Sequence, residues 1–226
     1  MSTATDERPT ARVGRGSFLW SRLGSFLAIA PLGVWTVIHL WNNLAVFSGG
    51  RAWEIAVTEH TSPVSLVVTT VIVLLPLAIH TGWGIARLLA SRPNNRRYGF
   101  FANLKYLLQR ASAVGVLGFL GAHLWLAFLE PRLVQHRPEP FADIAGQMRH
   151  HPPTLVVYLL GTLGVAYHLA NGLSGAAMGW GLVATQAGLR KVDRVAAVIF
   201  VLLLAMSWGA IYGLWNAGLP YLPIND

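Results

Sequence analysis

Five long apolar stretches constrain the fold of this chain more than any other feature. They cover about residues 23–47, 63–89, 111–129, 155–180 and 195–215. A helix needs about 20 mostly apolar residues to cross a membrane, and each stretch is close to that length or longer. Membrane-spanning strands are shorter and alternate in polarity, which these stretches do not. Because a spanning helix satisfies its own backbone groups, the sequence predicts an all-α integral membrane protein with five transmembrane helices.

The charge composition supports a membrane location. Only 12% of the 226 residues are charged, whereas a soluble domain is nearer a quarter charged. The net charge of +8 would indicate nucleic-acid binding in a soluble protein, but the long uncharged stretches and 9 Trp argue against that partner. Cys is absent, which excludes disulfides, thiolate iron–sulfur clusters, Cys-based zinc sites and covalent haem attachment.

The Lys and Arg residues indicate the orientation. Thirteen of the 17 lie in the N-terminal segment and around the second and fourth connections, and the remaining four lie on the other side. The positive-inside rule therefore predicts a cytoplasmic N-terminus and an outer C-terminus. We expect residues 1–16 to form a disordered cytoplasmic tail, without the features of a signal peptide. Residues 17–217 would form the five-helix domain, and residues 218–226 a short outer tail.

The longest connection, residues 130–153, has two interpretations. Phe141, Ile144 and Met148 fall at helical spacing, which is typical of a short interfacial helix. The segment is also rich in proline, so an irregular loop is the alternative.

Each of the first four spans contains one histidine: His39, His80, His123 and His168. A single buried histidine is usually a hydrogen-bonded core residue, but its recurrence on four successive spans favours ligand binding. At about 1.5 Å per residue, His39 and His123 lie toward the outside, and His80 and His168 toward the inside. Two imidazoles at one level can hold a planar macrocycle from both faces. A haem with two histidine ligands has no open position and transfers electrons, so we expect the first four spans to form a haem-binding bundle.

Two further features near these histidines each have two interpretations. Glycines share the helical face of His168, where they would leave room for a porphyrin edge or allow close helix packing; they are Gly161, Gly164, Gly172 and Gly175. Arg87 follows His80 by two turns at the inner edge. It would bind haem propionates or simply follow the positive-inside rule.

The nine acidic residues all lie outside the spans. Proton pumps usually need ionisable relays inside the bilayer, so this distribution argues against one. The alternative to electron transfer is a small transporter or channel with a histidine-lined interior.

Several motifs together resemble the di-haem cytochrome b membrane anchor of succinate dehydrogenase, over about residues 16–216. They are Ser17–Leu23, Pro31–Val34, His39–Asn43, Leu75–Leu77 with His80, Leu107–Arg110, His123–Trp125 and His168–Leu173.

The resemblance implies a subunit that binds two b haems in a bacterial cytoplasmic membrane. Flavoprotein and iron–sulfur subunits would attach on the cytoplasmic side, and electrons from succinate would pass to a quinone, usually menaquinone. The chain alone would not oxidise succinate. By similarity, His80 and His168 bind the proximal haem iron, and His39 and His123 the distal one.

The sequence lacks one acidic residue found in some related enzymes, and one other class of cytochrome is an alternative. Some fumarate reductases have a Glu in a proton path two residues before the fourth ligand, where this chain has Ala166. A cytochrome of a hydrogenase or formate dehydrogenase is the alternative within electron transfer.

We place quinone reduction near the outer end. It takes up two protons, so the site needs groups that pass them. Glu54, Glu59 and His60 follow the span of His39 and are the titratable groups nearest to it along the chain. Their alternative interpretation is as solvated loop residues.

Overall fold

The computed structural model describes residues 15–59, 62–90 and 100–221, and every regular element within these ranges is a helix. Five helical segments are long and apolar enough to cross a membrane: Arg22–Ser48, Pro63–Leu89, Asn103–Leu133, Pro152–Gly179 and Gln186–Ala217. The predicted fold class and the number of spans are therefore confirmed. Tail residues 1–14 and 222–226 lie outside the described ranges.

The first three spans each consist of several helical pieces. The first contains α1 (Arg15–Leu27), η1 (Ala28–Gly33), α2 (Val34–Asn43) and η2 (Leu44–Ser48). The second contains α4 (Pro63–Thr69), η3 (Thr70–Leu74) and α5 (Leu75–Leu89), and the third contains α6 (Phe100–Leu124), η4 (Trp125–Leu129) and α7 (Glu130–Leu133). The fourth and fifth spans are the single helices α9 (Pro152–Gly179) and α10 (Gln186–Ala217).

Prolines account for the breaks, because η1, η3 and η4 are π-helical turns that each contain or precede one. Pro31 lies within η1, while Pro76 and Pro131 lie two residues beyond η3 and η4. A proline ring clashes with the carbonyl four residues earlier, and for Pro76 and Pro131 that residue lies inside the π-turn. The wider turn accommodates the ring without ending the span.

Two short helices lie outside the spans. A 3-10 turn ends at Gly49, whose φ of 101° suits glycine, and α3 (Gly50–Val57) follows. Helix α8 (Phe141–His150) confirms the helical interpretation of the long connection. Its apolar residues Phe141, Ile144 and Met148 are 5%, 3% and 0% exposed. They pack within the protein core, so this face does not lie free at the membrane surface.

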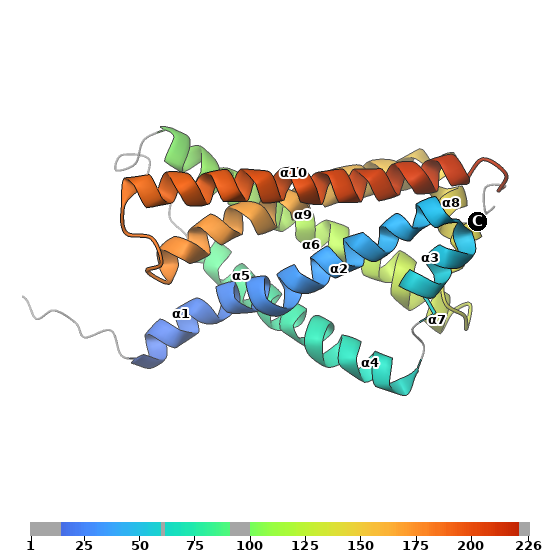
Figure 1. Ribbon diagram of the computed structural model, residues 1–226. Coiled ribbons are helices and arrows are strands. Elements are labelled where there is room, and N and C mark those ends of the chain that lie inside the picture. The colour runs from blue at the N-terminus through green and yellow to red at the C-terminus, as the bar shows by residue number, and fades with distance from the viewer. Residues whose placement is uncertain (1–14, 60–61, 91–99, 222–226) are drawn as a thin grey trace, which may run out of the picture.

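The spans form an elongated bundle (Figure 1). Helix α10 runs along α9, which also packs against α6, and α1 and α2 cross the same bundle obliquely. Helix α4 diverges from the others at one end of the bundle, where α3, α7 and α8 also lie (Figure 1). We call this the α8 end, and the opposite end, where α1 begins and α9 stops, the α1 end.

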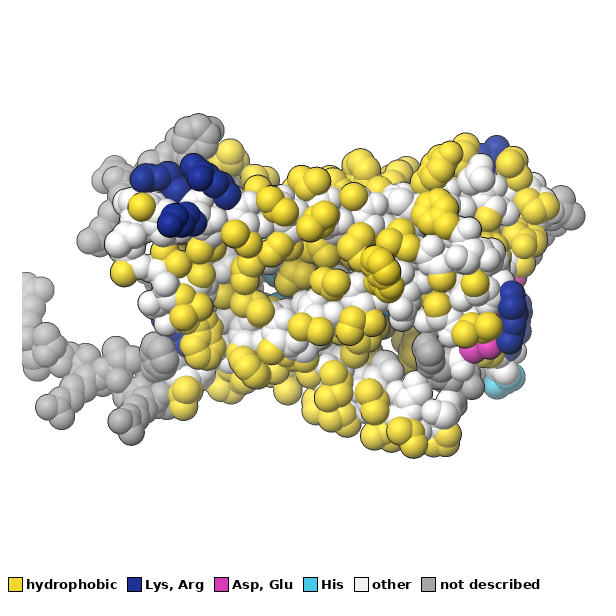
Figure 2. All heavy atoms as spheres, viewed as in Figure 1, with side chains coloured by type: hydrophobic (Ala, Val, Ile, Leu, Met, Phe, Trp, Pro, Cys, Tyr) yellow, Lys and Arg dark blue, Asp and Glu magenta, His cyan; other side chains and the backbone are white. Residues whose placement is uncertain are grey.

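The buried core is concentrated at the α8 end. It joins residues of α3, α8, α9 and α10, including Trp53, Ile144, Met148, Tyr158 and Leu214. Elsewhere large apolar side chains face outward, such as Leu160, 64% exposed, and Val201, 60% exposed. Figure 2 shows this apolar surface covering most of the bundle, with an opening near its middle. Such a surface fits lipid and not water.

The contact between α6 and α9 depends on the absence of a side chain from Gly161, whereas Gly164 leaves room for one. A Cβ atom at Gly161 would overlap the ring of Phe119 on α6, and one at Gly164 would touch Val116 at 3.5 Å. Of the four aligned glycines, Gly161 is therefore the one that close helix packing requires. A Cβ at Gly172 would lie 3.5 Å from the side-chain nitrogen of Gln109, whereas one at Gly175 would face open space.

We expect Gly161→Ala to destabilise the protein, because Phe119 must move or α6 and α9 must separate. Overpacking of this kind costs about 1–3 kcal/mol, so the thermal unfolding midpoint in detergent should fall. Gly175→Ala on the same helix is the matched control and should leave the midpoint unchanged. Equal midpoints for the two variants would contradict this packing.

Candidate functional site

The four predicted histidines come together in two pairs inside the bundle. The ring centroids of His39 and His123 lie 5.9 Å apart, with the ring planes at 67°. Those of His80 and His168 lie 6.3 Å apart at 70°. The spatial pairing inferred from residue depth is thus present: the first span pairs with the third, and the second with the fourth.

The two pairs suit a metal that takes two axial nitrogen ligands. Imidazole nitrogens bind transition metals at about 2.0 Å, which places two rings on opposite sides of one ion with centroids about 6 Å apart. The described residues contain no group of three or more His, Cys, Asp or Glu that would enclose a metal by themselves. Two ligands alone leave four positions to another donor, as a porphyrin supplies. The donor set therefore fits a bis-histidine haem at each pair.

The tautomer of His80 follows from its hydrogen bond. Its Nδ1 lies 2.9 Å from the carbonyl oxygen of Gly24. A carbonyl only accepts, so Nδ1 carries the proton and Nε2 keeps its lone pair. Trp83 stacks on this ring at 6.3 Å and lies against Gly24, where a Cβ would overlap it. Helix α1 thus fixes both the orientation and the ligating nitrogen of His80.

His168 has two polar neighbours on α6, and only one can accept its proton. The Gln109 amide nitrogen lies 3.2 Å from Nδ1 but donates to the His168 carbonyl oxygen at 3.1 Å. Its oxygen accepts from Asn171 at 2.8 Å, which fixes the amide orientation. The Ser112 hydroxyl donates to the Gln109 carbonyl at 3.0 Å and lies 3.3 Å from Nδ1. Ser112 is therefore the acceptor that allows His168 Nε2 to bind metal.

His123 lies in an aromatic environment at the other pair. Its Nδ1 is 3.1 Å from the hydroxyl of Tyr158, which accepts the Nδ1 proton when Nε2 binds metal. Phe119 stacks on its ring at 5.5 Å and 20°. Phe119, which packs against Gly161, thus also orients His123.

His39 differs from the other three histidines, because its contacts come mainly from its own span. Trp35 stacks on its ring at 4.6 Å. Asn43 donates to the His39 carbonyl at 2.9 Å and lies 3.4 Å from Nε2, while its oxygen accepts from Trp53 at 3.2 Å. The Trp53 indole of α3 therefore fixes the orientation of the Asn43 amide beside His39.

The two pairs lie at different levels along the bundle. Ser112, beside His168, and His123 are 11 residues apart in helix α6, which corresponds to a rise of about 16 Å. The His80–His168 pair lies nearer the α1 end, and the His39–His123 pair nearer the α8 end. This order agrees with the predicted levels.

Arg87 is exposed at the α1 end, with its guanidinium 5.2 Å from the centre of the Trp83 ring. Trp83 in turn stacks on His80. The Trp83 ring thus connects Arg87 to the His80–His168 pair.

The predicted acids lie at the α8 end, where both contact Arg51. Glu59 hydrogen-bonds Arg51, which raises the pKa of that guanidinium, and Glu54 lies 3.6 Å from it. Glu54 also accepts a hydrogen bond from the Phe141 backbone nitrogen at 3.0 Å, at the first residue of α8. His60 lies outside the described residues. Glu54 therefore joins α3 to α8, a structural role that the sequence did not indicate.

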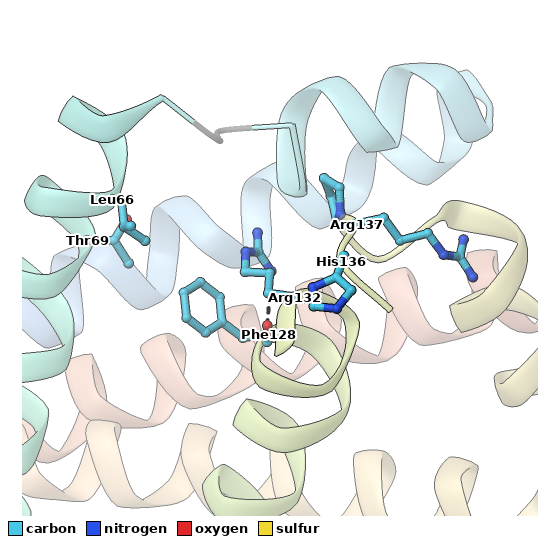
Figure 3. Close-up of a pocket in the computed structure, with 7 residues that line it drawn as sticks. Leu66, Thr69, Phe128, Arg132, His136 and Arg137 are labelled. Atoms are coloured by element: carbon cyan, nitrogen blue, oxygen red, sulfur yellow. Dashed lines mark hydrogen bonds between the residues drawn. The ribbon is translucent and has the colours of Figure 1, made fainter. Parts of the chain in front are cut away.

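A cavity of about 270 Å³ opens at the α8 end between the second and third spans. Figure 3 shows Leu66 and Thr69 of α4 on one side, facing Phe128, Arg132 and His136 on the other. The Arg132 guanidinium lies 4.3 Å from the centre of the Phe128 ring and donates to the Phe128 carbonyl at 3.3 Å. The cavity combines apolar walls with polar side chains from Thr69, Arg132, His136 and Arg137, and Glu54 and Glu59 do not line it.

Sequence reasoning gave no role to most of the residues that orient the histidines. Asn43 lies four residues after His39, so helical spacing alone could have placed it there. Gly24, Ser112 and Tyr158 lie on other spans than the histidines they contact. No sequence spacing joins such positions, because the contacts depend on how the helices pack.

The chain is similar to a cytochrome subunit of known name. It is 29% identical, over 201 residues, to the succinate dehydrogenase cytochrome b558 subunit of Bacillus subtilis. The match covers 88% of this chain and 98% of that relative. No protein-family profile matches the chain. The similarity confirms the resemblance that the histidine motifs indicated.

We expect Ser112→Ala to weaken haem binding between His80 and His168, because Nδ1 of His168 loses its acceptor. Loss of such a hydrogen bond typically costs about 10- to 100-fold in affinity, measurable by haem titration of the purified protein. Ser207→Ala is the control, since that hydroxyl donates only to Leu204 of its own helix at 3.1 Å. An unchanged affinity in Ser112→Ala would refute the assignment of Ser112 as the acceptor for His168.

Proposed function

We propose that this chain, similar along nearly its whole length to a succinate dehydrogenase cytochrome b subunit, is the membrane-anchor and electron-transfer subunit of such a complex. It passes electrons from an iron–sulfur partner through two b haems to a quinone, with menaquinone as the expected acceptor. The chain carries the quinone-reducing part of the activity and does not oxidise succinate alone.

The pairing of the histidines at two levels is the observation that supports this function best. A transporter lined by histidines would not need two facing pairs with ring separations of 5.9 and 6.3 Å. Nor would it need an Nδ1 hydrogen bond that leaves Nε2 free, as at His80. When bound, a haem with two imidazole ligands accepts and donates single electrons and leaves no site for oxygen.

The protein's own residues set the conditions for that chemistry. His80 and His168 hold the proximal iron, and His39 and His123 the distal one. Gly24, Ser112 and Tyr158 accept the Nδ1 protons, which raises the basicity of the ligating nitrogens. Arg87 is placed to bind a propionate at the α1 end, and Gly164 and Gly172 line the face of α9 beside His168.

We assign the α1 end to the cytoplasmic side of a bacterial inner membrane. Arg190, Lys191 and Arg194 are exposed at the start of α10, where Figure 2 shows Lys and Arg side chains gathered. Lys105 of α6 binds Asp193 at 2.6 Å and fixes the start of α10 to the third span. The positive-inside rule supports this orientation, and a basic face suits docking of the flavoprotein and iron–sulfur subunits. The second connection also contains Arg92, Arg96 and Arg97, which lie outside the described residues.

We assign quinone binding to the cavity at the α8 end. A cavity of about 150 Å³ holds benzene, so about 270 Å³ has room for a quinone head group. Helix α4 diverges here (Figure 1), which opens the cavity toward lipid for an apolar tail. Arg132 can donate a hydrogen bond to a quinone oxygen. Glu54 and Glu59 lie at the same end and are proposed to take up protons from the outer water.

We expect each histidine pair to hold its haem independently. His80→Ala or His168→Ala should remove the proximal haem, and His39→Ala or His123→Ala the distal one, halving the haem content in a pyridine haemochrome assay. His136→Ala, outside both pairs, is the control and should retain both haems. Absence of haem from the intact complex would refute the proposed function.

We expect Thr69→Trp to reduce quinone reduction at least about tenfold, because an indole fills the cavity that the quinone head would occupy. Haem content and succinate oxidation by an artificial dye should stay unchanged. Val68→Trp is the matched control: Val68 is on the same helix, is 53% exposed and does not line the cavity. If both variants reduce quinone at the normal rate, the quinone binds elsewhere.

A further inference from the structure

Glu139 is a buried acid at the α8 end, outside both histidine pairs. Its side chain lies in the connection between α7 and α8, and only 4% of the residue is exposed. An ionised carboxylate in such a place pays a large desolvation cost. Burial raises the pKa of Glu139 to about 8, so the neutral acid predominates at pH 7.

The neighbouring charges divide between those that oppose ionisation of Glu139 and those that favour it. Asp143 of α8 and Glu130 of α7 raise its pKa further, while Arg132 and Arg137 lower it. The acids have partners of their own, since Asp143 binds Arg137 at 2.8 Å and Glu130 accepts from Gln135 at 3.4 Å. Glu139 is thus the buried member of a cluster whose other acids are more exposed.

The position of Glu139 joins the cavity to the second histidine pair. It directly follows Pro138, and residues 136–138 line the cavity together with Arg132. Glu139 also interacts electrostatically with Tyr158, whose hydroxyl lies 3.1 Å from His123. Outer water is also near, because Glu54, which reaches solvent, accepts a hydrogen bond from the backbone of Phe141 two residues later. A neutral acid between water and a cavity is suited to donate protons.

We propose that Glu139 donates the protons taken up when a quinone is reduced in the cavity lined by Leu66, Thr69 and Arg132. This rests on the proposed function, in which succinate oxidised by the soluble partner supplies two electrons through the chain. For each proton, the O–H bond of Glu139 breaks and an O–H bond forms on a quinone oxygen, with water in the cavity carrying the proton between them because Glu139 itself does not line the cavity. The carboxylate then takes a proton from the outer water before the second transfer. Two electrons and two protons convert the quinone to the quinol.

Glu139→Gln tests the proposal in the whole complex, because glutamine keeps the size and polarity but has no acidic proton. Reduction of a short-chain menaquinone analogue should fall at least about tenfold, with haem content and dye-linked succinate oxidation retained. In the native complex the quinone rate should decline as pH rises above about 8, and this decline should be absent from the variant. Glu139→Asp, which restores an acid, should recover part of the rate.

An infrared spectrum provides a readout that does not depend on turnover. The native complex at pH 7 should show the carbonyl band of a protonated carboxylic acid that shifts in D₂O and is missing from Glu139→Gln. Glu130→Gln is the matched control: it should keep the quinone rate but move the alkaline decline to lower pH, because it removes a negative charge beside Glu139.

Different results would refute the proposed function and the role of Glu139. A native complex without haem or without quinone reduction would refute the proposed function. A native complex that reduces quinone, with Glu139→Gln retaining the full rate and the same alkaline decline, would refute the role of Glu139. Absence of the protonated-acid band at pH 7 would also refute it.

Discussion

The need to satisfy each imidazole inside an apolar bundle governs the arrangement of this protein. A polar ring in the hydrocarbon region is costly unless it is hydrogen-bonded or bound to a ligand. Three of the four histidines meet this need with a group on another span: Gly24 for His80, Ser112 for His168 and Tyr158 for His123. Each contact links two helices through Nδ1 and leaves the second ring nitrogen available to bind a metal. The packing of the bundle and the geometry of the pairs therefore depend on the same hydrogen bonds.

The two ends of the bundle differ in a way that suits different tasks. At the α8 end, short helices, a buried aromatic core and an inter-span cavity bring several acids together around Arg51, Arg132 and Arg137. At the α1 end, exposed Arg and Lys residues lie at the start of α10, with one ion pair between Lys105 and Asp193. The partner docking at the basic end, the proton uptake at the acidic end and the direction of electron transfer that we propose all rest on this asymmetry.

Proline-associated π-turns make the first three spans irregular without interrupting them. A π-turn inserts an extra residue into the helical register and so rotates the side chains that follow relative to those that precede it. In the first and second spans the turns lie before His39 and His80, and in the third span the turn follows His123. The straight fourth and fifth helices have none. The irregular spans therefore adapt to a bundle whose continuous members, α9 and α10, pack closely along their length.

The sequence by itself determined the class of fold, the five spans, the four histidines and their division into two levels. These features follow from hydrophobic length and helical rise, which act along the chain. The helix at Phe141–His150 was also recognisable from spacing, but its burial against the core was not. Tertiary structure decided everything that depends on how one span rotates against another. It selected Ser112 over Gln109 as the acceptor for His168, turned Gly161 toward Phe119, joined Glu54 to α8, and placed the buried Glu139 beside a cavity. Spacing within one helix carries no information on its rotation against another, because that rotation is set by side-chain packing between spans.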